Sequence, residues 1–347
     1  MKKFLSNKNT LTNYATYAGV ILLFVILQSM SATGGLSSTL KGQLVPVCAY
    51  IVMALSLNLT VGVLGELSLG HAGFMSMGAF AGAVASAALK DLIPMGGLRL
   101  LVAMIIGALF AALAGVIVGV PVLRLRGDYL AIVTLAFGEI IKSIVTNLYV
   151  GKDASGLHFS FLDPELNMEG GKMILNGPIG VSGISKISTF TAGFLLIMVT
   201  LIIIFNLVNS RSGRAIMALR DNRIAAESVG INVTKYKLMA FVISASLAGA
   251  AGTLFALGQN TVSANKFDFN TSILVLVFVV LGGLGRMWGS IIAAAALTIL
   301  PELLREFSEY RMLIYAIVLI LVMLATHNPT IKGFFGRIFK RKGAKEA

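Results

Sequence analysis

Side chains that could carry out catalysis are few and far apart in this sequence of 347 residues. The three histidines, His71, His158 and His327, form no HExxH pattern, and the single cysteine, Cys48, lies in an apolar run. These spacings argue against a zinc protease and exclude an intramolecular disulfide. The sequence also has no GxxxxGK(S/T) loop to hold ATP phosphates and no recognisable group of serine, histidine and acid. We therefore predict no catalytic residue, no metal and no cofactor bound by this chain.

Small and polar residues in the third apolar run could line a path through a membrane. This run holds Ser68, His71, Ser76 and Gly78, and Gly82 stands at GxxxG spacing from Gly78. Small residues let helices approach closely in lipid, so tight packing is one interpretation. The other is that an interrupted, glycine-rich helix exposes polar groups to a transport pathway.

One ionisable pair lies inside the fifth apolar run. Glu139 and Lys142 are three residues apart, so they share a helix face. Ionisable groups at membrane depth are costly, and they usually pair or face the interior of a bundle. We expect a structural pair in which Lys142 reaches outward, with Glu139 as part of a polar pathway as the alternative.

A charged segment with a helical pattern follows the sixth apolar run. Asp221 or Asn222 can cap the start of a short helix there, and Gly230 can end it. Glu227 lies near the C-terminal end of this helix, where the helix dipole disfavours an acid, so we expect an external partner for its carboxylate. We interpret the segment as a docking site, with a plain solvated loop as the alternative.

The composition that surrounds these residues is that of a membrane protein, with 57% hydrophobic and only 12% charged residues. A membrane-crossing helix needs roughly 20 apolar residues, so the chain has room for about ten. We therefore predict an all-α, polytopic bundle of transmembrane helices. Hydropathy places its spans at 14–32, 44–64, 68–89, 99–122, 129–149, 189–208, 238–258, 271–285, 287–304 and 311–326.

The basic residues orient these spans. The net charge of +13 is concentrated in short segments beside apolar runs, which is typical of the positive-inside rule and not of nucleic-acid binding. Both chain ends are then cytoplasmic. The resulting single domain, 1–347, has an external loop at 151–188, a cytoplasmic loop at 209–237 and a basic cytoplasmic tail at 327–347. The external loop is either a connector or part of a surface that meets a soluble binding protein.

Glycines interrupt the apolar sequence between the eighth and ninth spans. We expect a tight hairpin that turns at Arg286. The alternative is a broken helix that lines a cavity, because irregular backbone at membrane depth must be buried in protein or in contact with water.

Four blocks of this sequence, at 64–83, 123–142, 213–254 and 280–297, resemble the permease subunits of branched-chain amino acid ABC importers of the LivM type. The resemblance implies a ten-helix permease in the bacterial cytoplasmic (inner) membrane. It implies import of branched-chain or related hydrophobic amino acids by alternating access. It also implies that this subunit is not an enzyme and that separate subunits hydrolyse the ATP.

The resemblance also implies partners: ABC ATP-binding subunits, a second related permease, an extracytoplasmic substrate-binding protein and membrane lipid, but no nucleic acid. The sequence around Ala225 resembles the motif by which permeases couple to their ATPase, although it lacks the Leu-Pro that follows in the fuller form. The coupling residues implied are Asp221, Arg223, Ala225, Ala226, Glu227 and Gly230. The candidate translocation path comprises Ser68, His71, Ser76, Gly78 and Glu139.

Two alternatives to this function remain. A permease for urea or short amides, from the same superfamily, is the alternative for the substrate. An ion-coupled secondary transporter is the alternative for the mechanism, but it should carry more acidic residues within its spans than Glu139.

Overall fold

The computed structural model describes residues 8–33, 35, 37–123, 128–153, 156–163, 166, 171–304, 310, 313–314, 316–317 and 319–320. The chain divides into two compact units, Met1–Ala295 and Ala296–Ala347. Nearly all of the described residues belong to the first unit, and the architecture below is that of the first unit.

Long apolar helices dominate the described chain. They are α1 (Lys8–Ala32), α2 (Ser38–Asn58) with its π-helical continuation η1 (Leu59–Leu64), α3 (His71–Ala88), α4 (Gly96–Val122), α5 (Asp128–Thr146), α6 (Phe190–Asn209), α9 (Val233–Ala256), α10 (Phe269–Gly282) and α11 (Met287–Leu303). Each of the first nine predicted spans overlaps one of these helices. The tenth, at 311–326, lies largely outside the described residues.

Within the described residues, six helical segments are long and apolar enough to cross a membrane. These are Asn13–Ala32, Ser38–Leu64, Gly96–Val122, Tyr129–Thr146, Phe190–Asn209 and Val233–Ala256, and the helices Phe269–Gly282 and Met287–Leu303 are apolar but shorter. The chain is therefore a multi-pass membrane protein.

The centre of the bundle is formed by α2 and α9. Of the most apolar stretch of each helix, 89% of the residues in α2 with η1 and 72% in α9 are buried, compared with 33% in α4. Small residues allow α3, α4 and α9 to pack closely. A Cβ atom on Gly78 would lie 2.1 Å from the carbonyl oxygen of Gly249, and the hydroxyl of Thr253 donates to the carbonyl of Gly78 at 2.8 Å. These close contacts match the packing that small residues permit in lipid.

A sharp turn at 283–286 separates α10 from α11. Gly283 and Gly285 have positive φ angles of 93° and 78°, which residues with a Cβ rarely adopt. A Cβ on Gly289 would lie 1.8 Å from the carbonyl oxygen of Gly282, so only glycine permits this approach. The chain thus forms two helices that turn where the hairpin interpretation expects the turn, next to Arg286.

A small antiparallel sheet accompanies the helices, in the order β2-β1-β3-β4-β5. Its strands are β1 (Leu148–Lys152), β2 (Leu157–Phe161), β3 (Lys172–Asn176), β4 (Gly180–Ser182) and β5 (Thr261–Val262). The all-α prediction holds for the bundle but misses this sheet, which occupies much of the predicted external loop. The fifth span was also drawn too long, because α5 ends at Thr146 and β1 begins at Leu148.

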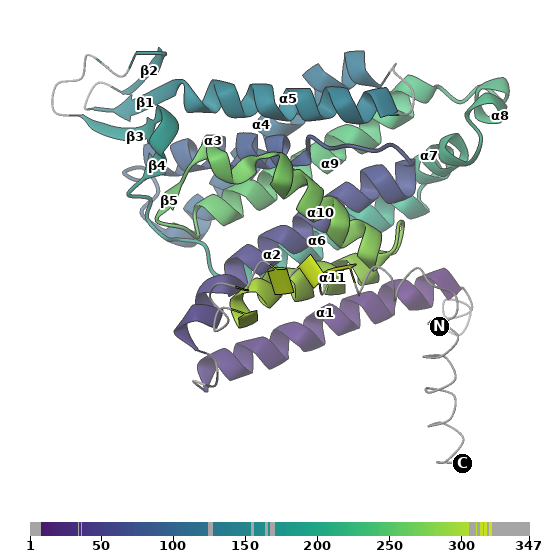
Figure 1. Ribbon diagram of the computed structural model, residues 1–347, viewed down its shortest axis with the longest axis horizontal. Coiled ribbons are helices and arrows are strands. Elements are labelled where there is room, and N and C mark those ends of the chain that lie inside the picture. The colour runs from purple at the N-terminus through teal and green to yellow at the C-terminus, as the bar shows by residue number, and fades with distance from the viewer. Residues whose placement is uncertain are drawn as a thin grey trace. The chain divides into compact units, whose positions relative to one another are not determined.

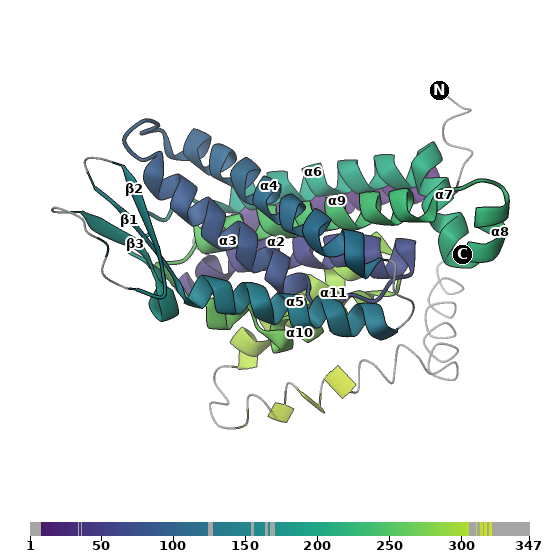
Figure 2. The same ribbon diagram turned by 90° about the horizontal axis from the view of Figure 1, so that it is seen from above.

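Two short helices, α7 (Arg211–Asp221) and α8 (Arg223–Ser228), connect α6 to α9. Both views place them at the end of the bundle opposite the sheet (Figures 1 and 2). The predicted external and cytoplasmic loops therefore lie at opposite ends of the long helices.

Candidate coupling site and pathway residues

The short helix α8 is capped at both ends by its own sequence. The side-chain oxygen of Asn222 accepts a hydrogen bond from the backbone N–H of Ala225 at 3.0 Å, so Asn222, and not Asp221, is the N-cap. The helix ends at Ser228, and Gly230 then takes a positive φ of 84°. The predicted capped helix is confirmed, one residue shorter than expected.

One face of α8 is fixed to the molecule and the other is free. Ala226 is 4% exposed and packs in a small cluster with Leu219 and Val233. Ile224 and Val229 are 80% and 75% exposed. Because burying an apolar side chain is favourable, this exposed pair offers a contact surface to another protein.

The charges on α8 are paired within the chain. The guanidinium Nε of Arg223 lies 3.0 Å from the carboxylate of Glu227, one helical turn away. Arg223 thus compensates this acid near the helix C-terminus, but the Glu227 side chain is still 46% exposed, and its external partner stays a prediction.

A line of hydrogen bonds connects α7 to the turn between α10 and α11. Arg220 donates to the carbonyl of Gly62 in η1 at 3.0 Å. Just before η1, the side chain of Asn58 accepts from the backbone N–H of Gly285 at 2.8 Å and donates to the hydroxyl of Ser290 at 2.9 Å. We call these five residues the α7–η1–α10 relay, although its far end is Gly285 in the turn that follows α10 and Ser290 on α11. Sequence reasoning missed it, because its members lie far apart along the chain.

A buried ion pair stands beside this relay. Lys237, in the first turns of α9, pairs with Glu66, which follows η1. The side chains of Lys237 and Glu66 are only 6% and 14% exposed. The sequence gives no local signal for this pair, because Glu66 and Lys237 are 171 residues apart.

The start of α3 is surrounded by polar groups from three other helices. The ring Nε2 of His71 lies 2.7 Å from the hydroxyl of Ser56 on α2. The backbone N–H of Ala72 donates to Ser272 of α10, and that of Leu69 donates to Thr134 of α5. This predicted pathway residue, His71, is thus buried at a junction of helices that is rich in hydroxyl groups.

The other predicted pathway residues are dispersed. Ser68 and Ser76 are fully buried, and their hydroxyls have no hydrogen-bond partner among the described residues. Gly78 lies in the contact between α3 and α9, the place that tight packing predicts. On α5, Glu139 forms the expected pair with Lys142, at 3.3 Å.

Metal ligands are not clustered in the part of the chain that the structure describes, where no group of three or more His, Cys, Asp or Glu side chains could hold an ion. The geometry is that of a bundle with a projecting, apolar-tipped helix and a buried polar junction.

Comparison with known proteins shows which family the sequence resembles. A family described as branched-chain amino acid transport system, permease component, matches residues 40–323. Two proteins named high-affinity branched-chain amino acid transport system permease protein LivM, from Salmonella typhimurium and Escherichia coli, are each 39% identical over 290 residues. These matches cover 79% of this chain but only 66% of each relative's length.

A more distant relative comes from Methanocaldococcus jannaschii. It is named a probable branched-chain amino acid transport permease protein LivM and is 26% identical over 287 residues, covering 74% of this chain and 78% of its own. No solved structure matches the chain.

Proposed function

The chain belongs to the family of branched-chain amino acid transport permeases, and from this membership we propose that it is the membrane subunit of an ATP-driven importer. The proposed substrates are branched-chain or related hydrophobic amino acids. Transport would proceed by alternating access, with ATP hydrolysed on separate subunits and no ATPase site in this chain.

The observation that carries the coupling part of this proposal is the geometry of α8. Its cap and the buried Ala226 hold the helix in place, while Ile224 and Val229 project from it. The helix lies at the end of the bundle opposite the sheet (Figure 2). A rigid helix with an exposed apolar tip can transmit the movement of a docked partner, which a flexible loop cannot do. We assign the docking role to 221–230.

The α7–η1–α10 relay supplies a route for this movement into the bundle. Coupling requires an element with two arrangements whose balance both sites affect. The relay contains a π-helical turn, η1, and such turns occur frequently at functional sites. We propose that displacement of α7 is transmitted through Arg220 to η1, and through Asn58 to the turn at Gly285.

The topology and partners belong to the same proposal. We propose ten spans with both termini cytoplasmic, α8 facing ATP-binding subunits, and the sheet facing an extracytoplasmic binding protein. A second related permease would complete the pathway. Within this chain we keep Ser68, His71, Ser76, Gly78 and Glu139 as pathway candidates, of which His71 has the most polar surroundings.

Substitution of Ile224 tests the docking role. Ile224→Glu should leave the fold intact, because this side chain is 80% exposed, but should reduce co-purification of the ATPase subunits and uptake at least tenfold. Ile179→Glu, at the sheet end and 62% exposed, is the matched control and should bind the ATPase normally. Normal ATPase binding by both variants would exclude α8 as the docking element.

The substrate is tested in the reconstituted complex with its binding protein. Leucine, isoleucine and valine should each stimulate ATP hydrolysis, whereas urea should not. Stimulation by urea or a short amide alone would replace the proposed substrate class and leave the permease assignment in place.

A further inference from the structure

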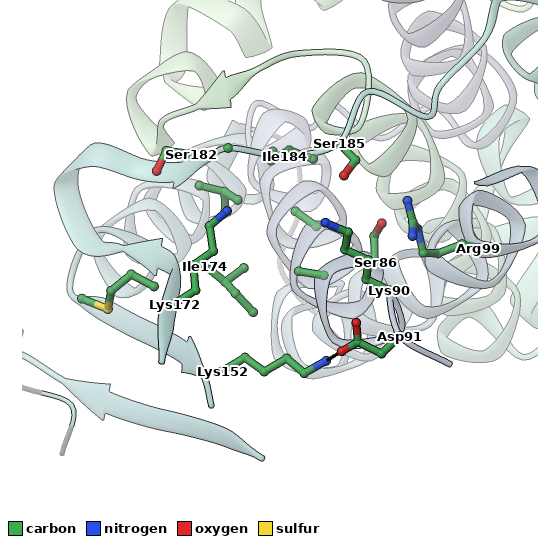
Figure 3. Close-up of a pocket in the computed structure, with 15 residues that line it drawn as sticks. Ser86, Lys90, Asp91, Arg99, Lys152, Lys172, Ile174, Ser182, Ile184 and Ser185 are labelled. Carbon is green, nitrogen blue, oxygen red and sulfur yellow. Dashed lines mark hydrogen bonds and ion pairs between the residues drawn. The ribbon is translucent and has the colours of Figure 1, made fainter. Parts of the chain in front are cut away.

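A cavity of about 180 Å³ opens at the end of the bundle that carries the sheet (Figure 3). It lies between the end of α3, the start of α4 and the strands β3 and β4. All of its lining residues belong to the first unit, and none belongs to the coupling segment or to the residues proposed for the pathway.

Positive charge predominates in this cavity. Four basic residues line it, and Asp91 is the one acidic residue among them. Lys152 donates to Asp91 at 2.6 Å and to the carbonyl of Ala88 at 3.0 Å, and this hydrogen bond from Lys152 holds the pKa of the Asp91 carboxyl below its usual value. Asp91 thus neutralises one of the four positive charges, chiefly that of Lys152 and in part that of Lys90, which leaves three positive charges in excess.

The three remaining cations are Lys90, Lys172 and Arg99. In Figure 3, Lys90 and Lys172 lie on opposite sides of the cavity, and the ammonium group of Lys172 lies near Gly183. Neither Lys90 nor Lys172 has an ion-pair partner within the described part of the chain. Like charges that converge on one space repel each other, and an anion between them would relieve this repulsion.

Arg99 provides the second, independent indication of a ligand. It is only 6% exposed, and its Nε has no hydrogen-bond partner among the described residues. Burying a guanidinium group without a partner is costly, so such a group usually has an anion to bind. Guanidinium donors match the oxygens of phosphate well, and Ser86, Ser182 and Ser185 add hydroxyl donors around the same cavity.

Exposed apolar side chains beside the cavity indicate where the anion comes from. Leu92, Met95, Leu98 and Leu101 are 78%, 71%, 51% and 50% exposed and flank the charged residues in sequence. The last two lie on α4, a helix long and apolar enough to cross a membrane. Because α4 begins at this cavity and is apolar enough to cross a membrane, we expect the cavity to lie near the level of the lipid headgroups.

We propose that this cavity binds a phosphate group, presented by an anionic phospholipid whose acyl chains lie along Leu98 and Leu101. Phosphatidylglycerol fits the excess of positive charge. Phosphatidylethanolamine carries an ammonium group that Lys90 and Lys172 would repel. The site goes beyond the transport function and does not depend on it.

The test measures the thermal stabilisation of the detergent-solubilised full chain by added short-chain lipids. Phosphatidylglycerol should stabilise the chain more than phosphatidylethanolamine. Because Arg99 would donate charge-assisted hydrogen bonds to the phosphate, Arg99→Gln should weaken apparent phosphatidylglycerol binding by about tenfold or more. Lys172→Gln, an exposed position, should also weaken binding and covers the case in which the Arg99 variant does not fold. Lys41→Gln, a basic residue away from the cavity, should behave as wild type.

Inorganic phosphate, measured against chloride at equal ionic strength, distinguishes the source of the anion. A response to phosphate without a preference for phosphatidylglycerol would keep the phosphate site and overturn the lipid source. If Arg99→Gln and Lys172→Gln were stabilised by lipid and by phosphate to the same extent as wild type, the site would be overturned. A defect confined to docking of the extracytoplasmic binding protein would also overturn it, since an acidic protein surface would then be the occupant. ATP hydrolysis by the assembled complex is not part of this readout, so the proposal fails or stands separately from the transport function.

Discussion

Single side chains join segments of this bundle that are remote in sequence. The ion pair between Lys237 and Glu66 connects positions 171 residues apart, at the point where α9 begins and η1 has just ended. Both side chains are largely removed from water, so each one depends on the other. The pair therefore fixes the base of α9 beside the segment that leads to the polar junction around His71.

Removal of one partner of this pair should destabilise the protein strongly. Lys237→Ala leaves the Glu66 carboxylate buried without its cation, and such changes typically cost about 3–5 kcal/mol. The free energy of unfolding, measured by denaturant titration in mixed micelles, should fall by this amount. The neighbouring exposed Lys235→Ala should change it by no more than about 0.5 kcal/mol. Equal effects of the two substitutions would contradict the pair's structural role.

A second prediction at this scale separates packing from conduction at Gly78. A Cβ at this position would lie 2.1 Å from the carbonyl oxygen of Gly249, so Gly78→Ala should destabilise the bundle by about 1–3 kcal/mol. Gly97→Ala, in a helix position with no atom within 4 Å of the added Cβ, should be neutral or slightly stabilising. Thermal unfolding of both variants checks this. A fully stable Gly78→Ala protein with impaired uptake would instead favour a role in the pathway.

At the scale of elements, the α7–η1–α10 relay makes a prediction about coupling. Arg220→Met removes the donor to the carbonyl of Gly62 and the ion pair with the adjacent Asp221, but it leaves the N-cap Asn222 and the exposed apolar tip of α8 in place. We expect normal ATPase binding with uptake per ATP hydrolysed reduced at least fivefold. The matched variant is Arg214→Met, which alters an exposed arginine of the same helix that donates to the carbonyl of Asn209. Uptake and ATP hydrolysis are measured together in proteoliposomes. An unchanged ratio of uptake to hydrolysis in Arg220→Met would exclude a role of the relay in coupling.

The elements that sequence could predict are those whose signals are local. The cap of α8 is encoded within nine residues by Asn222 and Gly230, and the long helices are encoded by continuous apolar runs. The sheet was missed because β1 to β4 are strands of only three to five residues in a segment interrupted by glycine, asparagine and proline, and β5 joins them from a segment about 80 residues beyond β4. Neither the relay nor the buried Lys237–Glu66 pair could be found, since their partners are likewise brought together only by folding. The basic cavity escaped notice for the same reason.

At the scale of the whole molecule, the proposed orientation predicts which surfaces face which side of the membrane. In a Cys48→Ala background, cysteines at Ser228 on α8 and Ser182 on β4 should react with a membrane-impermeant maleimide from opposite sides. Both positions are exposed, whereas Cys48 is buried and leaves little background. We expect Ser182→Cys to be labelled in intact cells and Ser228→Cys only after the membrane is opened. Labelling of both positions from one side would refute the proposed topology.

The helix α9 reaches both of these surfaces. It has 24 residues and is therefore about 36 Å long, comparable to the thickness of a bilayer core. Its first turns hold Lys237, beside the segment that carries α8, and shortly after its last turn the chain enters β5 of the sheet. The single helix α9 thus has one end near α8 and the other end near the sheet. Thermodynamic linkage is reciprocal. If attachment of a protein at the sheet changes affinity at α8 through a shift of α9, attachment at α8 must change affinity at the sheet by the same free energy. An effect of the binding protein on ATPase affinity would then require no contact between the two, and its size could be measured from either side of the membrane.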